Sequence, residues 1–149
     1  DESLVGRIFL HDRLVVVASP NLKRPKGDLA VPVVVRGADN EAAAWNIKRP
    51  SGTSRLAVDP VLRLSSLMMV RDAIRAGVGA ARLPLSLVSH DLASGTLLRW
   101  GDVEGSDIAL WTLYPSRRLL SARVSAFLDH LKEAFPKGTP DELAAYIGG

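Results

Sequence analysis

The unbroken apolar run Leu14-Val15-Val16-Val17-Ala18 constrains the fold of this chain more than any other feature of the sequence. Successive side chains of a β-strand point to opposite faces of the sheet, so a run without polar residues predicts a strand covered on both faces. Such strands are typical of α/β domains, in which helices pack against a parallel or mixed sheet. The run is far shorter than the roughly 20 apolar residues of a membrane-spanning helix.

Strand-type and helix-type patterns alternate along the rest of the chain, which also favours an α/β fold. The expected strands are 4–10, 14–18, 31–36, 45–49, 55–59, 61–64, 80–83, 97–100 and 108–114, with a turn at 11–13 and a hairpin turn at 50–53. The expected helices are 66–76, which Gly77 ends, 84–93, which Pro84 begins and Gly95 ends, 121–135, which Ser121 caps, and a short one within 141–147. An apolar stripe of Val124, Phe127, Leu128 and Leu131 marks the third helix. Serine and proline before a helix and glycine after it are ordinary boundary signals.

Composition excludes several classes of protein. The 149 residues, 47% hydrophobic and 23% charged, suit one globular domain or two small lobes rather than a disordered chain. A net charge of +3 would be compatible with binding nucleic acid, but the basic residues are scattered along the chain. The local clusters at 23–26 and 117–118 are better explained as solvated surface. No cysteine is present, so disulfides, zinc–thiolate sites and thiol catalysis are excluded.

No residue pattern supports catalysis, a metal site or a cofactor. His11, His90 and His130 lie far apart, without the spacing of carboxylates or cysteines that metal sites use. Ser89-His90-Asp91 holds the residue types of a catalytic triad, but three consecutive helical residues point in different directions. Gly77-Val78-Gly79 follows a helix and precedes a strand, which is the reverse of a dinucleotide-binding loop.

A helix-turn-helix is also excluded, because the apolar strand at 80–83 separates the helices 66–76 and 84–93. The remaining interpretation is a binding module.

Six segments then resemble, in order and in spacing, the effector-binding (substrate-binding) domain of LysR-type bacterial transcription regulators. They are 13–20 with Leu22, similar to an "ASPxxL" segment; 27–29; Trp45; 73–84, similar to "aGlGia.lP"; 92–97; and 114–117 with 127–129. Together they cover about Ser3 to Phe135. Arg82 departs from the pattern, since that strand is normally apolar at this position.

The resemblance implies a periplasmic-binding-protein type 2-like α/β fold of two lobes with a ligand cleft between them. Residues 1–18 and 115–149 would be the remnant of the first lobe, and 19–114 would be the second lobe with its crossover strands. The beginning of the first lobe and the N-terminal DNA-binding domain would be missing, so we expect a complete second lobe and a partial first lobe.

The function implied is that of a bacterial, cytoplasmic effector sensor that performs no chemistry and needs no cofactor. It would bind a small polar or anionic metabolite, self-associate as a dimer or tetramer, and reach promoter DNA through a separate domain, with no membrane partner. The alternative is a secreted or periplasmic solute-binding protein of the same fold. An enzyme on a related two-lobe fold would need a catalytic constellation.

The resemblance also indicates candidate site residues. The positions that match the family's cleft are Ser19, Leu64, Ser65, Ser66, Leu83 and Pro84. Helix N-termini at this cleft would present free N–H groups, which favour anions, although one of the two adjacent serines is also explained as a simple helix cap. The candidate dimer surface comprises Met68, Met69, Arg75 and Leu98, for which an ordinary exposed face is the competing interpretation. Trp45 and Trp111 are expected in the core.

Overall fold

The computed structural model describes residues 4–37, 43–115 and 121–148. Its strands are β1 (Leu4–Ala18), β2 (Val31–Arg36), β3 (Ala44–Arg49), β4 (Gly52–Leu64), β5 (Ala81–Pro84) and β6 (Leu98–Pro115). Its helices are α1 (Leu67–Arg75), α2 (Leu85–Ser94), α3 (Ala122–Ala134) and α4 (Pro140–Gly148). The strands form a 6-stranded sheet in the order β2-β4-β3-β6-β1-β5. β2 and β4 pair in parallel and the other pairs are antiparallel, so the expected mixed α/β architecture is confirmed.

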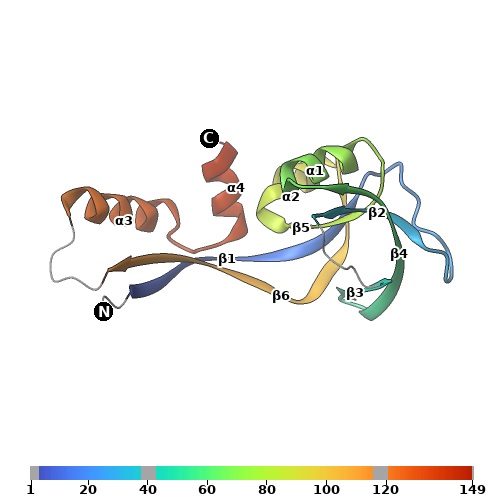
Figure 1. Cartoon of the computed structure of the whole chain (residues 1–149), viewed down its shortest axis with the longest axis horizontal. Coiled ribbons are helices and arrows are strands. Elements are labelled where there is room, and N and C mark those ends of the chain that lie inside the picture. Colours follow the sequence, from blue (N-terminus) through green and yellow to red (C-terminus); the bar gives the residue numbers. More distant parts are fainter. Residues whose placement is uncertain (1–3, 38–42, 116–120, 149) are drawn as a thin grey trace.

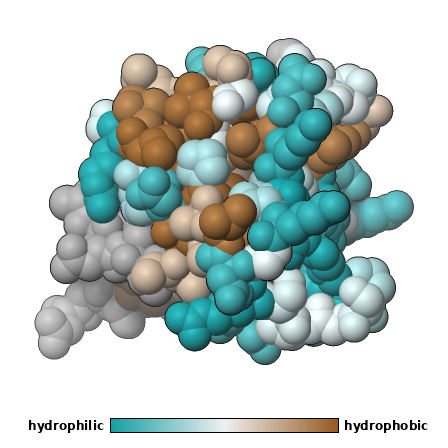
Figure 2. Space-filling view, turned by 90° about the vertical axis from the view of Figure 1, so that its right-hand side faces the viewer, coloured by the Kyte–Doolittle hydropathy of each residue, from teal (hydrophilic) through white to brown (hydrophobic). Residues whose placement is uncertain are grey.

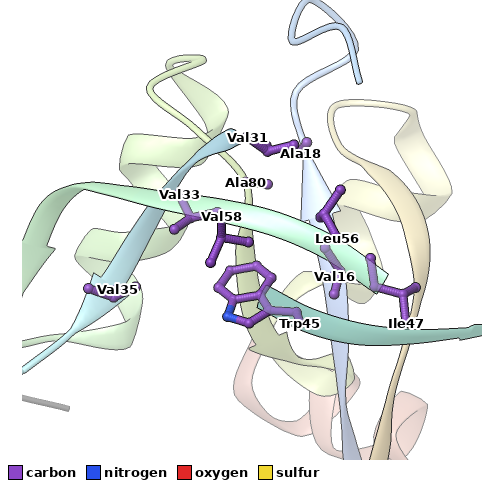
Figure 3. Packing of buried hydrophobic residues seen from close by; sticks show 10 residues of the cluster. All are labelled: Val16, Ala18, Val31, Val33, Val35, Trp45, Ile47, Leu56, Val58 and Ala80. Atoms are coloured by element: carbon purple, nitrogen blue, oxygen red, sulfur yellow. The ribbon is translucent and has the colours of Figure 1, made fainter. Parts of the chain in front are cut away.

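The sheet curls until its two edges almost meet. Val33 of β2 forms a parallel bridge with Ala80, next to β5. Two backbone hydrogen bonds hold this contact, from the Val34 N–H to the Ala80 carbonyl and from the Ala80 N–H to the Pro32 carbonyl, each at 2.9 Å. The curled strands enclose a cluster of buried side chains (Figure 3). Its members are Val16, Ala18, Val31, Val33, Val35, Trp45, Ile47, Leu56, Val58 and Ala80.

The apolar run of β1 is buried on both faces, as expected. Val16 and Ala18 point into the enclosed cluster. Val15 and Val17 point the other way, into a second cluster that α1 and α2 cover with Val70, Ile74 and Val88. Because neighbouring residues of a strand face opposite sides, only an unbroken apolar run can serve both clusters.

A paired charge joins the two covering helices. Arg75 of α1 donates to both carboxylate oxygens of Asp91 of α2, each at 2.8 Å, and Asp91 is buried. The hydrogen bonds from Arg75 to Asp91 raise the pKa of Arg75 above its ordinary value. Arg75 therefore stays charged at physiological pH, and its two hydrogen bonds to Asp91 fix α1 against α2.

Three expectations about strand ends were wrong. β1 continues through 11–13, where a turn was expected, and the strands predicted at 55–59 and 61–64 are one strand, β4. The strands predicted at 97–100 and 108–114 are likewise one strand, β6. Contacts with residues distant in the sequence keep the strands continuous at these positions. Buried Asp12 accepts hydrogen bonds from Ser86, and β4 exchanges its partner β3 for β2 after Ala57.

The paired strands β1 and β6 extend well beyond the curled sheet, and α3 lies beside their far half (Figure 1). There Leu10, Leu131 and Phe135 form a small third cluster. Much of the outer surface of this part is apolar: of the stripe on α3, Leu131 is buried, Leu128 is half-buried, and Val124 and Phe127 are exposed.

Trp111 of β6 is 54% exposed, so its assignment to the core was wrong, whereas Trp45 is buried as expected. The basic pair at 117–118 lies outside the described residues. No helix within the described ranges is long and apolar enough to span a membrane.

Candidate functional site

A cavity of about 310 Å3 lies where strand ends meet the first turns of α1 and α2. β2, β4 and β5 run in the same direction and end here, and α1 follows β4 directly while α2 follows β5. In open α/β sheets, ligands bind outside the carboxyl ends of such strands. The cavity is lined by Leu14, Val34, Val35, Arg36, Trp45, Leu67, Val70, Arg82, Pro84 and Ile108.

Two arginines supply all the charge among these lining residues. Arg36 is exposed at the end of β2, and Arg82 of β5 is half-buried. The guanidinium carbon of Arg82 lies 4.7 Å from the centroid of the Trp45 ring, the geometry of a cation–π contact. Because no lining residue is acidic, the cavity favours an anion.

The two helix N-termini differ from each other. Ser66 is the N-cap residue of α1, and its side chain makes no capping hydrogen bond. The start of α2 is already occupied: Asp12 accepts from the Ser86 N–H at 3.3 Å and from the Ser86 hydroxyl at 2.5 Å. A carboxylate in this position accepts a hydrogen bond from an N–H group at the helix N-terminus and interacts favourably with the positive end of the helix dipole. Asp12 thus occupies the Ser86 N–H at the start of α2, where free N–H groups were expected to face an anion, and the arginines carry the positive charge of the cavity.

The predicted effector-site residues lie at different distances from the cavity. Pro84 lines the cavity, and Leu64, Ser65 and Ser66 lead into its lining residue Leu67. Leu83 is fully buried in the second cluster, so its side chain does not reach the cavity.

Ser19 is not brought to the cavity at all. It lies five residues beyond the lining residue Leu14 on β1, about 16 Å along an extended chain. Its side chain accepts a hydrogen bond from the Asn21 N–H at 3.2 Å, which closes the turn after β1.

Sequence reasoning missed Arg36 altogether and noted Arg82 only as a departure from the family pattern. Arg36 had a usable signal, because a charged residue directly after a buried apolar strand is placed at the sheet edge where ligands bind. Arg82 carried a signal too, since an arginine inside a short buried strand needs a specific partner, and Trp45 is one.

The candidate dimer residues lie outside this cavity. Met68 and Met69 of α1 are 58% and 53% exposed, and Leu98 of β6 is 46% exposed. Arg75 is instead engaged with Asp91. Figure 2, which views the end of the molecule that faces right in Figure 1, shows apolar patches interrupted by polar side chains.

A larger, open concavity of about 890 Å3 lies beside the β3–β4 hairpin, between residues 48–51 and 99–102. Its two arginines already have partners within the chain: Arg49 donates to the Trp100 carbonyl at 2.7 Å, and Arg99 pairs with Asp102. It also lies away from the helix N-termini, so the smaller cavity is the candidate site.

The described residues contain no cluster of three or more histidine, aspartate or glutamate side chains that could hold a metal ion. His11, His90 and His130 are exposed and lie on three different elements, β1, α2 and α3.

Comparison with known proteins agrees with the geometry. The family model described as LysR substrate binding domain matches residues 1–136. The transcriptional regulator PtxR of Pseudomonas aeruginosa is 29% identical over 93 residues, which are 60% of this chain and 29% of PtxR.

Two solved structures share the fold. CrgA, a LysR-type regulator of Neisseria meningitidis, superposes with a TM-score of 0.70 at 23% identity, over 89% of this chain and 48% of CrgA. The regulatory domain of AphB from Vibrio vulnificus gives 0.65 at 21% identity, over 89% of this chain and 70% of that domain. The chain thus spans less than half the length of PtxR and of this CrgA chain.

These matches favour a regulator over the transport alternative, and the family is one of transcription regulators rather than enzymes. With a family model that matches nearly its whole length and the periplasmic-binding-protein type 2-like fold of LysR regulatory domains, the chain belongs to the LysR substrate-binding domain family.

Proposed function

We propose that this chain is the effector-sensing domain of a LysR-type regulator and that the cavity beside Arg36 and Arg82 binds a small anionic metabolite. One observation carries the proposal: a cavity of about 310 Å3, with two arginines and no acid among its lining residues, lies at the carboxyl ends of three strands. That volume is at the small end of the range for ligand pockets. The parent protein would bind promoter DNA through a separate domain and act in the bacterial cytoplasm.

The proposed signal passes through β1 and β6, the strands that cross between lobes. In this proposal residues 1–18 and 115–149 belong to the first lobe and 19–114 to the second. Leu14 of β1 and Ile108 of β6 both line the cavity, so a bound ligand touches both crossover strands. A ligand that contacts one arrangement of the lobes better than another shifts the population toward it.

The crossover strands are irregular beside the cavity. The register between β1 and β6 shifts between Arg13 and Val15. Here the hydroxyl of Ser106 donates to the Val103 carbonyl at 2.7 Å and accepts from the Leu14 N–H at 3.2 Å. Bulges bend strands and increase their twist, so this is the position where the two lobes would reorient.

Self-association is proposed through the exposed face of α1. Adjacent Met68 and Met69 present flexible apolar side chains, which are common at protein interfaces. Replacing both with glutamate should lower the dimer fraction at micromolar concentration in sedimentation velocity, with Arg123→Glu on α3 as a control. Unchanged association in the double variant would place the interface elsewhere.

Blocking the cavity tests the effector proposal. Ile108 is half-buried, lines the cavity and belongs to none of the core clusters, so Ile108→Trp should fill the cavity without disturbing the core. Leu113→Trp introduces the same side chain on the same strand at a position that is 63% exposed. A panel of bacterial metabolites would be screened by thermal shift, and each hit would be measured by calorimetry.

A metabolite that stabilises the unmodified chain and Leu113→Trp, but not Ile108→Trp, is the expected result. A panel with no hits, or hits that bind all three proteins equally, would refute the effector site.

A further inference from the structure

Arg82 and Trp45 form a layered surface at the cavity wall. Trp45 is 3% exposed and packs into the enclosed cluster, so the indole itself offers almost no surface to a ligand. Arg82 lies over this ring at 4.7 Å and also lines the cavity. What the cavity presents in front of the indole is therefore the Arg82 guanidinium.

A guanidinium that packs over an aromatic ring can serve as a stacking platform for a ligand. Its plane is rigid and weakly hydrated, and it stacks readily on flat unsaturated groups. A lysine ammonium at this position would keep the positive charge but would offer no plane. The platform thus favours a flat ligand over a puckered one.

Arg36 supplies a second cation with a different role. It is exposed, and no hydrogen bond or ion pair joins its side chain to another described residue. Its forked donors match the geometry of a carboxylate, which guanidinium groups bind through two parallel hydrogen bonds. The competing anion site at the start of α2 is closed, because Asp12 already occupies it.

The rest of the wall is aliphatic. The remaining lining residues are Leu14, Val34, Val35, Leu67, Val70, Ile108 and Pro84. Such a wall solvates poorly any ligand group that carries further hydroxyls or charges. The body of the ligand should therefore be apolar and compact.

We propose that the effector is a flat, mainly apolar carboxylate, aromatic or conjugated, whose plane stacks on Arg82 and whose carboxylate is bound by Arg36. This inference rests on the proposed function, because it names the ligand class of the same cavity. Arg82 is then the residue that selects a flat ligand, and Arg36 is the residue that selects its charge.

Three probes separate shape from charge in calorimetric titrations of the 149-residue chain. Benzoate is flat and anionic, cyclohexanecarboxylate is anionic but puckered, and benzamide is flat but neutral. Loss of an aromatic or cation–π contact should make cyclohexanecarboxylate bind about three- to tenfold more weakly than benzoate. Loss of the charge-assisted hydrogen bonds should weaken benzamide by about tenfold or more.

Two variants assign these preferences to residues. Arg82→Lys keeps the charge and removes the plane, so it should abolish the difference between benzoate and cyclohexanecarboxylate. Arg36→Met should abolish the difference between benzoate and benzamide while the preference for a flat ring persists. Arg123→Met, on α3 and outside the cavity, should change neither ratio. Circular dichroism confirms that each variant is folded before titration.

Equal binding of benzoate and cyclohexanecarboxylate by the unmodified chain would overturn the stacking role of Arg82. Equal binding of benzoate and benzamide would overturn the charge selection by Arg36. Absence of benzoate binding at millimolar concentration would overturn the ligand class. If metabolites of another class still bound and were lost in Ile108→Trp, the effector function would stand, whereas absence of both signals would refute the function itself.

Discussion

Two glycines that are two residues apart should respond very differently to the same substitution. Gly77 follows α1 with a φ of 84°, and a Cβ added there would meet open space. Gly79 is not in the left-handed region, but a Cβ added there would lie 2.6 Å from the Pro32 carbonyl oxygen and 3.1 Å from the Val33 Cα. Gly77→Ala tests backbone strain, and Gly79→Ala tests the closure of the curled sheet.

The structure sets the size of each effect. A left-handed alanine costs about 1–2 kcal/mol, offset by about 0.5 kcal/mol because alanine restricts the unfolded chain, so Gly77→Ala should lose roughly 1 kcal/mol. Gly79→Ala must push β2 away from residues 79–80. This adds about 1–3 kcal/mol of overpacking to the weakening of two 2.9 Å hydrogen bonds worth about 1 kcal/mol each, a total near 3–4 kcal/mol.

Urea unfolding followed by tryptophan fluorescence measures both effects, because Trp45 lies inside the curled sheet. With a slope of about 2 kcal/mol per molar urea, the midpoint should fall by roughly 0.5 M for Gly77→Ala and by 1.5–2 M for Gly79→Ala. An equal or larger loss for Gly77→Ala would show that the bridge between β2 and β5 contributes little, and the closure argument would fail.

Three smaller predictions follow from single contacts. Asp12→Asn weakens the acceptor at the start of α2 and should cost about 1–2 kcal/mol in urea unfolding. Asp91→Ala removes the buried partner of Arg75 and should cost about 2 kcal/mol, with little change between low and high salt. Ser106→Ala removes the hydroxyl that bridges the irregular crossover and should cost about 1 kcal/mol while hydrogen exchange at Leu14 accelerates.

A matched control, a substitution at an exposed position, sets the scale against which these losses are compared. Thr53→Ala, at an exposed position of β4, should stay within about 0.5 kcal/mol of the unmodified chain. Losses no larger than this control would show that the contact in question does not contribute to stability. A strong salt dependence for the loss at Asp91 would show that its pairing is a screened surface interaction.

Local patterns predicted most of the elements of this fold. The run 14–18 required a strand covered on both faces, and Gly77, Gly95 and Ser121 correctly marked helix boundaries. Each of these signals acts within a few residues, because helix caps and strand alternation are properties of the local chain. The long strands were divided wrongly because their continuity depends on distant residues. Asp12 looks like a turn residue from its neighbours alone, but in the fold its carboxylate accepts a hydrogen bond from Ser86, which lies far away in the sequence.

The candidate site was predicted only in outline. Resemblance to the family placed Pro84 and the segment 64–66 near a cleft, but no local signal joined Arg36 to Arg82. They meet because β2 and β5 approach each other through a bridge between Val33 and Ala80, a contact between residues far apart in the chain.

The sequence by itself therefore determined most of the elements, the two-sided burial of β1 and membership of a family, since each depends on neighbouring residues or on ordered motifs. The tertiary structure alone decided which groups meet at the cavity. It placed Asp12 at the start of α2, where it accepts the Ser86 N–H, and it placed Arg82 over the Trp45 ring. Hydrogen bonds and ring contacts of this kind depend on the approach of strands that are not neighbours in sequence, and alternation along a single strand carries no information about its partner.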